Sequence, residues 1–587
     1  MNTNPSPRLA ERTGYALVMV MVFSAIGLMV LTGTMNWASQ TALMNERNNQ
    51  ISATTFAAEA STERIVSRLM FDYKASGESA TFNNLTSYRT NVPAASENSY
   101  WASFQFSNAS GTTNQNYVER TQSQIFTNLS GPYAGLRGFV SNYRVVSNAR
   151  QTTGRFTITN AVQQDLQLAS IPVFQFAIFY NSLLEFTWAA PLVVRGRVHA
   201  NSNIFLGSSA SLDLQQDVTA TGTIGKQDWF GYTMANYTGS ITYGGTATSN
   251  TSALTLPIGT NNSAAAVREV INIPPTAESM SSPMGQQRFY NKAEMLILVS
   301  NSTVVVKVKT PFDASPTTIN WSNANYFIST NTSFTDQREN KVMRTTELDI
   351  TKFRTWAATN TAVIAKLGAG NAPNIIYVAD DRSVTASQKT AVRLINGQTL
   401  PTRGLTLASV NPLYVKGHFN CTNAAHLGTT NTTSSRPSSL IADALTIQSG
   451  AWSDAASTSA YSSRVPSDTT VNAALLAGMV YSAGATGTSP MSGGVVNFPR
   501  LLEAWQQSPS RVLTLNGSLV NLFNSARATA PFQSPGVYYS APNRNFNFDP
   551  NFLDSTKMPP GSPELRVLIR GAWAAAPPNR TNYVASF

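Results

Sequence analysis

An uncharged apolar run near the N-terminus constrains this chain most strongly. Residues Tyr15–Leu31 contain no charged side chain, and the polar stretch before them carries Arg8 and Arg12. As an α-helix the run rises about 25 Å, and Thr32 and Gly33 extend it to about 29 Å, close to the ~30 Å hydrocarbon core of a bilayer. We therefore expect one transmembrane helix. Because positive charge precedes it, we expect a cytoplasmic N-terminus and a periplasmic or extracellular body, as in a single-pass inner-membrane protein.

Three kinds of targeting segment compete for this run. A cleaved signal peptide has a shorter apolar region, of about 7–15 residues, and a small-x-small cleavage site, which does not follow before Trp37. A plain signal anchor needs only the apolar span. A prepilin-type leader needs a short basic peptide, here residues 1–14, that ends in glycine and is cut on the cytoplasmic side. The Gly14-Tyr15 junction fits that third kind.

A helical pattern continues past the apolar run. No proline occurs between Tyr15 and Met70, so an unbroken helix over this segment would be about 84 Å long. A narrow apolar row with a seven-residue interval indicates an amphipathic helix. This row packs either against the protein's own head, which we favour, or against neighbouring helices in a filament. The residues predicted to pack in the membrane or along the helix are Tyr15, Met19, Phe23, Gly27, Leu31, Trp37, Met44, Ile51, Ala58 and Ile65.

These N-terminal features resemble a known family. The Gly14-Tyr15 junction, the apolar span, Asn45–Asn48 and the Thr-Phe-Ala-Ala-Glu-Ala stretch Thr55–Ala60 are similar to the start of PilX-type minor pilins of type IV pili. The resemblance covers about residues 10–70. It implies a precursor that prepilin peptidase cuts after Gly14 and that then assembles with other pilin-like subunits into a pilus or a related secretion filament.

The resemblance has one departure. Major pilins carry a glutamate at the fifth residue after cleavage, and Met19 occupies that position here. The departure implies a tip, priming or accessory subunit rather than a subunit of the filament shaft.

Composition separates the rest of the chain from most cytosolic enzymes. Charged residues make up 12% of the 587 residues, about half of the ~25% usual in soluble domains. The net charge of +11 is spread along the whole chain, whereas nucleic-acid binding needs a cluster, so we expect no specific nucleic-acid partner. Cys421 is the single cysteine, which excludes an intramolecular disulfide.

The body has the pattern of short β-strands. Period-two alternation in Gly138–Ser147 and Arg155–Thr159 predicts half-buried strands. From Leu192 onward, and again after residue 400, very short apolar segments alternate with Gly/Asn turns, which favours the parallel coils of a β-solenoid. An antiparallel sandwich remains an alternative. Asparagine suits such turns because it tolerates left-handed backbone and can form side-chain ladders between coils.

The predicted fold class is mainly β with a long N-terminal helix. A transmembrane, pilin-like helix precedes a β-solenoid-like body (a parallel β-helix) that carries an α/β insertion. The predicted boundaries are 1–14 for the leader, 15–70 for the helix, 71–180 for a β-rich head region, 181–264 for a first solenoid-like segment, 265–400 for the mixed insertion, and 401–587 for a second solenoid-like segment with a C-terminal wrap.

The polar candidates for catalysis are unconvincing. The pairs Asp213/Asp217 and Asp380/Asp381 are expected to be turn or surface carboxylates. We expect His199 to be a hydrogen-bonded structural residue. His418 and Cys421 would face opposite sides of a strand, and a zinc site needs three or four ligands. We therefore predict no catalytic residue, metal or cofactor, and a protein that is not an enzyme.

One aromatic group remains a possible surface-ligand site. Trp229, Phe230 and Tyr232 lie among Gly, Thr and Ser, as carbohydrate-stacking residues often do. Packing in the core is the favoured explanation, and an exposed row would indicate adhesion to surface polysaccharide. The predicted function is a non-enzymatic minor pilin-like component for assembly or adhesion. The alternatives are a signal-anchored envelope solenoid that binds or cleaves polysaccharide and a structural envelope protein outside any filament.

Overall fold

The chain folds into a long N-terminal helix followed by a large β-rich body. The computed structural model describes residues 14–108, 110–129, 133, 136–186, 191–207, 210–227, 238–255, 258, 263–482, 492–506, 509–532 and 537–576. These residues form two compact units. Unit 1 comprises Met1–Ile125, Val140–Ala169 and Arg566–Phe587, and unit 2 comprises Phe126–Phe139 and Ser170–Leu565. Most of unit 2 is therefore an insertion into the chain of unit 1.

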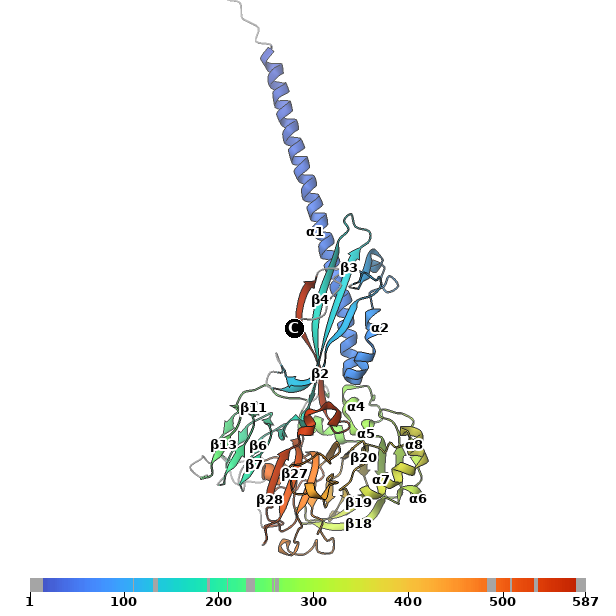
Figure 1. Ribbon diagram of the computed structural model, residues 1–587, viewed down its shortest axis with the longest axis vertical. Coiled ribbons are helices and arrows are strands. Elements are labelled where there is room, and N and C mark those ends of the chain that lie inside the picture. Colours follow the sequence, from blue (N-terminus) through green and yellow to red (C-terminus); the bar gives the residue numbers. More distant parts are fainter. Residues whose placement is uncertain are drawn as a thin grey trace, which may run out of the picture. The chain divides into compact units, whose positions relative to one another are not determined.

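Helix α1 dominates unit 1 (Figure 1). It spans Gly14–Asn83, with a kink at Gly77, where φ is 79°. The helix extends beyond Met70, where the sequence pattern placed its end, and its buried face continues there through Asp72, Tyr73 and Thr81. A short helix, α2 (Leu85–Arg89), follows it.

The sheet of unit 1 is completed by the last described strand. Its order is β1-β3-β4-β29, and β2 pairs with β3. Figure 1 shows β29, in red, beside β4. The C-terminal strand β29 thus belongs to a sheet whose other members precede it by some 400 residues. The bounds are β1 Phe104–Ser107, β2 Tyr117–Asn128, β3 Arg137–Gln151, β4 Thr159–Pro172 and β29 Glu564–Ala576.

One face of this sheet covers the second half of α1. The helix contributes Ile65, Val66, Leu69 and Tyr73 to a buried cluster, in which β3 and β4 supply Tyr143, Val145, Leu166 and Leu168. A second cluster joins Ala57 and Ala58 to Phe104, Phe106, Ala149 and Val162. An apolar stripe at helical spacing against a half-buried sheet is the usual way for such elements to form a core.

The first part of unit 2 consists of stacked parallel strands. Strands β7, β10 and β13 form one stack, β6, β9 and β12 a second, and β5, β8, β11 and β14 a third. Leu192 aligns with Leu212, and Leu212 with Ile241. The bounds are β5 Ile178–Tyr180, β6 Leu184–Glu185, β7 Leu192–Val194, β8 Val198–Ala200, β9 Ile204–Phe205, β10 Leu212–Leu214, β11 Val218–Ala220, β12 Ile224–Gly225, β13 Ile241–Tyr243 and β14 Ala247–Thr248.

The second part of unit 2 continues the third stack from its other end. The sheet runs β14-β11-β8-β5-β27-β26-β24-β22-β20-β15-β16-β17, with β28 on β27. Strands β27 and β5 are parallel, and Leu519 aligns with Ile178. Two stretches far apart in sequence therefore share one sheet. A further sheet has the order β18-β19-β21-β23-β25.

The elements of this second part follow in chain order. The strands are β15 Met295–Val299, β16 Val304–Val308, β17 Thr317–Ile319, β18 Ile328–Asp336, β19 Lys341–Asp349, β20 Ile375–Asp380, β21 Gln388–Ile395, β22 Leu405–Ser409, β23 Leu413–Lys416, β24 Ser438–Ala442, β25 Leu445–Gln448, β26 Thr469–Ala477, β27 Val512–Asn521 and β28 Asn543–Phe548. The helices are α3 Ala264–Arg268, α4 Pro283–Gln287, α5 Phe289–Lys292, α6 Trp321–Ala324, α7 Ile350–Thr359 and α8 Thr361–Leu367. Strands and helices thus both occur between residues 265 and 400, as the sequence pattern predicted.

Buried asparagines connect adjacent parallel strands. Asn472, Asn516 and Asn547 occupy equivalent positions in β26, β27 and β28. The Asn516 amide donates to Asn472 Oδ1 at 2.8 Å, and the Asn547 amide donates to Asn516 Oδ1 at 2.8 Å. Asn250 and Asn420 have positive φ values of 59° and 58°. Both expectations for asparagine, the side-chain ladder and the left-handed turn, are confirmed.

Candidate functional site

The first half of α1 is apolar and exposed. Every Leu, Ile, Val, Met, Phe and Tyr between Tyr15 and Leu31 is at least half exposed, from 51% at Val22 to 79% at Tyr15. Among the described residues, α1 is the helix long and apolar enough to cross a membrane. An apolar surface on all sides of a helix is unfavourable in water. This half of α1 is therefore the candidate functional site.

The predicted packing residues divide into two groups. Gly14 begins α1, and Met19, Phe23, Leu31, Trp37 and Met44 are all exposed, with Trp37 at 72%. A side chain added at Gly27 would contact nothing within 4 Å. Ile51 lies at the border with an exposed fraction of 36%, and Ala58 and Ile65 are fully buried. The seven-residue row thus packs on the protein's own sheet at Ala58 and Ile65. Toward the N-terminus its side chains are exposed.

The sequence pattern missed the polar part of this helix–sheet interface. Ser61 and Thr62 of α1 are buried. The Ser61 hydroxyl bonds Asn116 Oδ1 at 3.1 Å, and the Thr62 hydroxyl bonds Ser147 Oγ at 3.1 Å. Small hydroxyl residues next to Ala58 and Ile65 at helical spacing were the available signal. The Thr62 hydroxyl also bonds the Ala58 carbonyl within the helix at 2.9 Å. Ser61, bonded across the interface, therefore contributes most to fixing the rotation of the helix.

Ion pairs attach α1 to the strands of unit 1. Glu63 is paired with Arg570 of β29, and this hydrogen-bonded guanidinium lowers the pKa of Glu63. Glu78 accepts from Arg120 at 2.9 Å and from the Tyr143 hydroxyl at 3.0 Å. Burial, together with the nearby Glu78 carboxylate, raises the pKa of Tyr143. The helix is therefore held by strands from both ends of the chain.

His199 is structural, as predicted. Asn201 Oδ1 lies 3.0 Å from His199 Nε2, and the Thr219 hydroxyl lies 2.8 Å from Nδ1. An amide oxygen only accepts, so Nε2 carries the proton and Nδ1 accepts from Thr219. The ring stacks on Phe179 with 5.5 Å between centroids. Burial lowers the pKa of His199 to about 4, which keeps the ring neutral near pH 7.

The aspartate pairs are not arranged for acid–base chemistry. Asp213 accepts from the Thr242 hydroxyl at 2.7 Å, and Asp217 from the Thr246 N–H at 3.0 Å. Each contact joins neighbouring strand layers, and the hydrogen bonds lower both pKa values.

Asp380 requires a correction. It is fully buried rather than a turn or surface carboxylate, and it is paired with Arg382 at 2.6 Å. Successive side chains of a strand face opposite sides of a sheet. This alternation could not show that the Arg382 side chain turns back to neutralise the buried Asp380. Asp381 is half exposed and paired with Arg527 at 2.7 Å.

A buried glutamate escaped the sequence analysis. Glu503 is 1% exposed, and its two oxygens accept from the Ser449 N–H at 2.7 Å and the Ser449 hydroxyl at 2.6 Å. Burial raises the pKa of Glu503 to about 7. Because both oxygens are bound to Ser449, the carboxylate fixes a turn rather than facing a ligand.

The remaining polar candidates form no metal site. Cys421 is buried, and His418 Nδ1 accepts from the Thr470 N–H at 3.1 Å. Within the described ranges, no group of three or more His, Cys, Asp and Glu side chains could hold a metal ion. Trp229, Phe230 and Tyr232 lie outside the described residues, so their role in carbohydrate binding stays a prediction.

A Ser-His-Asn group on a loop resembles a triad in composition only. Ser434 Oγ lies 2.9 Å from His426 Nδ1, and the amides of Asn423 and Asn431 approach Nε2 at 3.2 and 3.3 Å. The amide oxygens of both asparagines accept backbone N–H groups, so their nitrogens point at the ring. Nε2 is thus the acceptor and Nδ1 donates to Ser434, which is the reverse of what activates a serine nucleophile.

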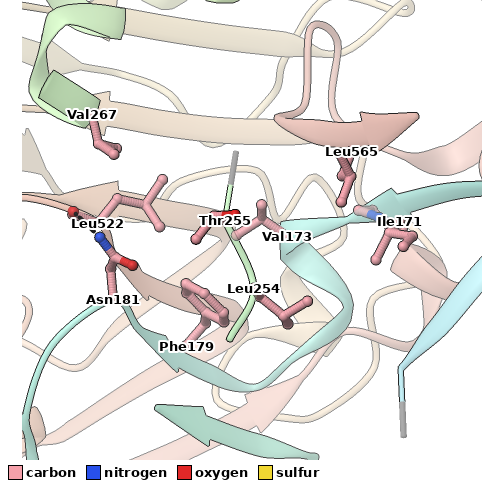
Figure 2. A pocket seen from close by; sticks show the side chains of 10 residues that line it. Ile171, Val173, Phe179, Asn181, Leu254, Thr255, Val267, Leu522 and Leu565 are labelled. Carbon is pink, nitrogen blue, oxygen red and sulfur yellow. Dashed lines mark hydrogen bonds between the residues drawn. The ribbon is translucent and has the colours of Figure 1, made fainter. Parts of the chain in front are cut away.

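An apolar pocket lies in unit 2 (Figure 2). Ile171, Val173, Phe179, Leu254, Leu522 and Leu565 are among its lining residues. Its one amide side chain, Asn181, donates to the Leu522 carbonyl at 3.2 Å and accepts from Asn201 at 2.8 Å. Among the described residues that line it, the pocket therefore presents mainly apolar contacts and no charged group.

Comparisons with known proteins give limited guidance. No family model and no curated protein match the chain. The crystal structure of the competence-associated pilin ComZ from Thermus thermophilus superimposes with a TM-score of 0.28 at 11% identity, over 89% of this chain and 96% of that chain. Function is therefore inferred from this chain's own residues and geometry.

Proposed function

We propose that this chain is a non-enzymatic, minor pilin-like component of a type IV pilus or a related secretion filament. Prepilin peptidase removes residues 1–14, the inner membrane holds the apolar half of α1, and other pilin-like subunits later pack against that half. The large head serves assembly or adhesion, and surface polysaccharide is a possible partner.

The observation that carries this proposal is the division of α1 into two halves. Residues Tyr15–Leu31 are exposed on all sides, whereas the part from Ala57 to Tyr73 has one face buried against the sheet of unit 1. A helix of this kind has one end built for an apolar environment outside the chain and another end fixed in a folded head. The resemblance to PilX-type minor pilins at Gly14-Tyr15, Asn45–Asn48 and Thr55–Ala60 supports the same function.

Met19 supports an accessory or tip position. After cleavage the new N-terminus would be Tyr15, and the fifth residue would be an exposed methionine instead of a carboxylate. An amine without a carboxylate partner in the apolar interior is costly to bury. Regular packing in a filament shaft is therefore disfavoured.

We further propose that the stacked parallel strands of unit 2 form a parallel β-helix, which carries the antiparallel pairs β15–β16, β16–β17 and β18–β19 as an insertion. Three stacks of short parallel strands between β5 and β14 support this architecture. The side-chain ladder from Asn472 through Asn516 to Asn547 supports it as well. Such a rigid, weakly charged body suits an exported head. Two of its buried carboxylates, Asp380 and Glu503, are bound by neighbouring side chains or backbone, which supports a structural rather than a catalytic role for these two residues.

Filament shearing tests the function. We would express wild type, Gly14→Val and Gly225→Val in the native host and compare sheared filaments with the membrane fraction. Gly225→Val is the matched control because Gly225 lies in unit 2 rather than in α1, and an added Cβ there meets its nearest atom at 3.5 Å, an ordinary contact. We expect wild type and Gly225→Val in the filaments and unprocessed Gly14→Val only in the membrane. Absence of the wild type from filaments, or equal incorporation of Gly14→Val, would contradict the proposal.

A further inference from the structure

The uncharged part of α1 is longer than its apolar run. No charged residue occurs from Tyr15 through Asn45. Two aromatic residues mark a shorter interval within it, Tyr15 at 79% and Trp37 at 72% exposure. Their separation of 22 positions corresponds to about 33 Å along a helix, which matches the ~30 Å hydrocarbon core of a bilayer. Tyrosine and tryptophan are enriched in the two interfacial layers of membranes.

The residues between Leu31 and Trp37 are compatible with lipid. The Thr32 hydroxyl donates to the Leu28 carbonyl at 2.7 Å, and the Thr34 hydroxyl donates to the Leu31 carbonyl at 2.9 Å. Both hydroxyl protons are thus bound within the helix, as hydrocarbon requires of a polar group. Met35 adds an exposed apolar side chain, and the polar Asn36 is adjacent to Trp37, where an interfacial position of the ring places its amide in the interfacial layer as well. This turn extends the apolar run rather than ending it.

The residues after Trp37 are suited to contact with water. Glu46 and Arg47 are exposed, and Gln50 is the first buried residue of α1. The Gln50 side chain forms two hydrogen bonds with the backbone of Phe156. Its Nε2 donates to the carbonyl, and its Oε1 accepts from the N–H. Residues 38–49 therefore form about 18 Å of largely exposed helix, along which Glu46 reaches Arg155 of unit 1 at 3.7 Å.

We propose that the bilayer contacts α1 from Tyr15 to Trp37, with these two rings in its opposite interfacial layers, and that residues 38–49 form a water-exposed stalk. The proposal rests on the membrane anchoring in the proposed function and adds its boundaries. Seven consecutive large apolar residues, Leu17–Phe23, are exposed and cover the whole circumference of the helix. Lipid fits this geometry, whereas a single partner helix would cover one face.

Cysteine scanning of the full chain tests these boundaries. Cys421, the single cysteine, is first replaced by serine, which retains a donor toward the Asn423 carbonyl that Cys421 contacts at 3.6 Å. Single cysteines are then placed at Val22, Thr34, Met35, Thr41 and Asn45. Each variant is produced in a host without pilus genes, so that lipid alone surrounds the helix. A membrane-impermeant maleimide is added from the periplasmic side, before and after detergent.

The expected pattern is a step at Trp37. Cysteines at positions 22, 34 and 35 should react at least about tenfold more slowly in membranes than in detergent, because hydrocarbon excludes both the reagent and the reactive thiolate. Cysteines at positions 41 and 45 should react equally in both. Adding Trp37→Leu should blur the step, whereas Trp37→Tyr should retain it.

Two other outcomes separate the possible failures. Rapid labelling at 34 and 35 with protection at 22 would overturn the boundary at Trp37 and leave the membrane anchor, and so the proposed function, intact. Rapid labelling at all five positions would refute the boundary and the membrane anchor together.

Discussion

Removing the amide of Asn516 should destabilise unit 2 by several kilocalories per mole. Asn516 is 1% exposed. Its nitrogen donates to Asn472 Oδ1 at 2.8 Å and to the Thr429 carbonyl at 2.9 Å, and its oxygen accepts from Asn547 at 2.8 Å. Asn516→Ala deletes three hydrogen bonds of about 1 kcal/mol each and leaves buried partners unsatisfied, so we expect a loss of about 3–5 kcal/mol.

Hydrogen exchange under increasing urea measures this loss of stability in the strands that carry the asparagine ladder. Peptides from β26 and β27 report on the ladder, so unfolding of unit 1 does not confuse the result. Asn543→Ala is the matched control, because Asn543 is exposed at the start of β28 and its loss should change stability by less than about 0.5 kcal/mol. A loss below about 1 kcal/mol for Asn516→Ala would refute the view that the ladder holds the strands together.

Three further predictions concern other parts of the chain. The buried His199, with its pKa lowered to about 4, binds a proton less readily than it does in the unfolded chain. The free energy of unfolding of the wild type should therefore fall by up to about 3 kcal/mol as pH drops from 6.5 to 4. In urea unfolding, His199→Gln should show a smaller fall over this pH range, and an equal fall in both proteins would contradict the lowered pKa of His199. Arg288, 2% exposed, is paired with Glu278 and with Glu269 at 3.0 Å, so Arg288→Ala should cost about 3–5 kcal/mol in a thermal unfolding assay. Substitution of the exposed Arg436 by alanine should be nearly neutral in the same assay. The Val173 N–H donates to the Pro563 carbonyl at 3.1 Å, so the insertion begins and ends at adjacent points. Replacing residues 174–562 with a turn of about four residues should therefore leave unit 1 folded, as measured by circular dichroism in detergent. Absence of cooperative unfolding in the shortened chain would refute the independent folding of unit 1.

The apolar helix, the short strands and their turns could be predicted from the sequence because interactions between residues close in the chain determine them. The uncharged run over Tyr15–Leu31 identifies a helix with an apolar surface, and Asn/Gly turns identify short strands. The structural role of His199 followed from its place in a strand-and-turn pattern. Each of these depends on neighbours within a few residues, where side-chain period and turn chemistry leave few alternatives.

The long-range arrangement was not accessible in the same way. No pattern in Glu564–Ala576 shows that β29 pairs with β4, because a strand carries no signal for a partner some 400 residues away. The alignment of Leu519 with Ile178 likewise depends on how the whole insertion returns to its starting point. The burial of Asp380 depends on Arg382 folding back on it, which alternation along a strand cannot reveal.

Determination of the N-terminus of the mature protein tests the central claim most directly. The protein would be extracted from membranes of its native host and of a matched strain without prepilin peptidase, and intact mass and N-terminal peptides would be measured by mass spectrometry. The pilin-like account predicts a chain that starts at Tyr15 in the first strain, with an N-methyl group, and a chain that retains residues 1–14 in the second. Retention of residues 1–14 in both strains would contradict the account and favour a plain signal anchor.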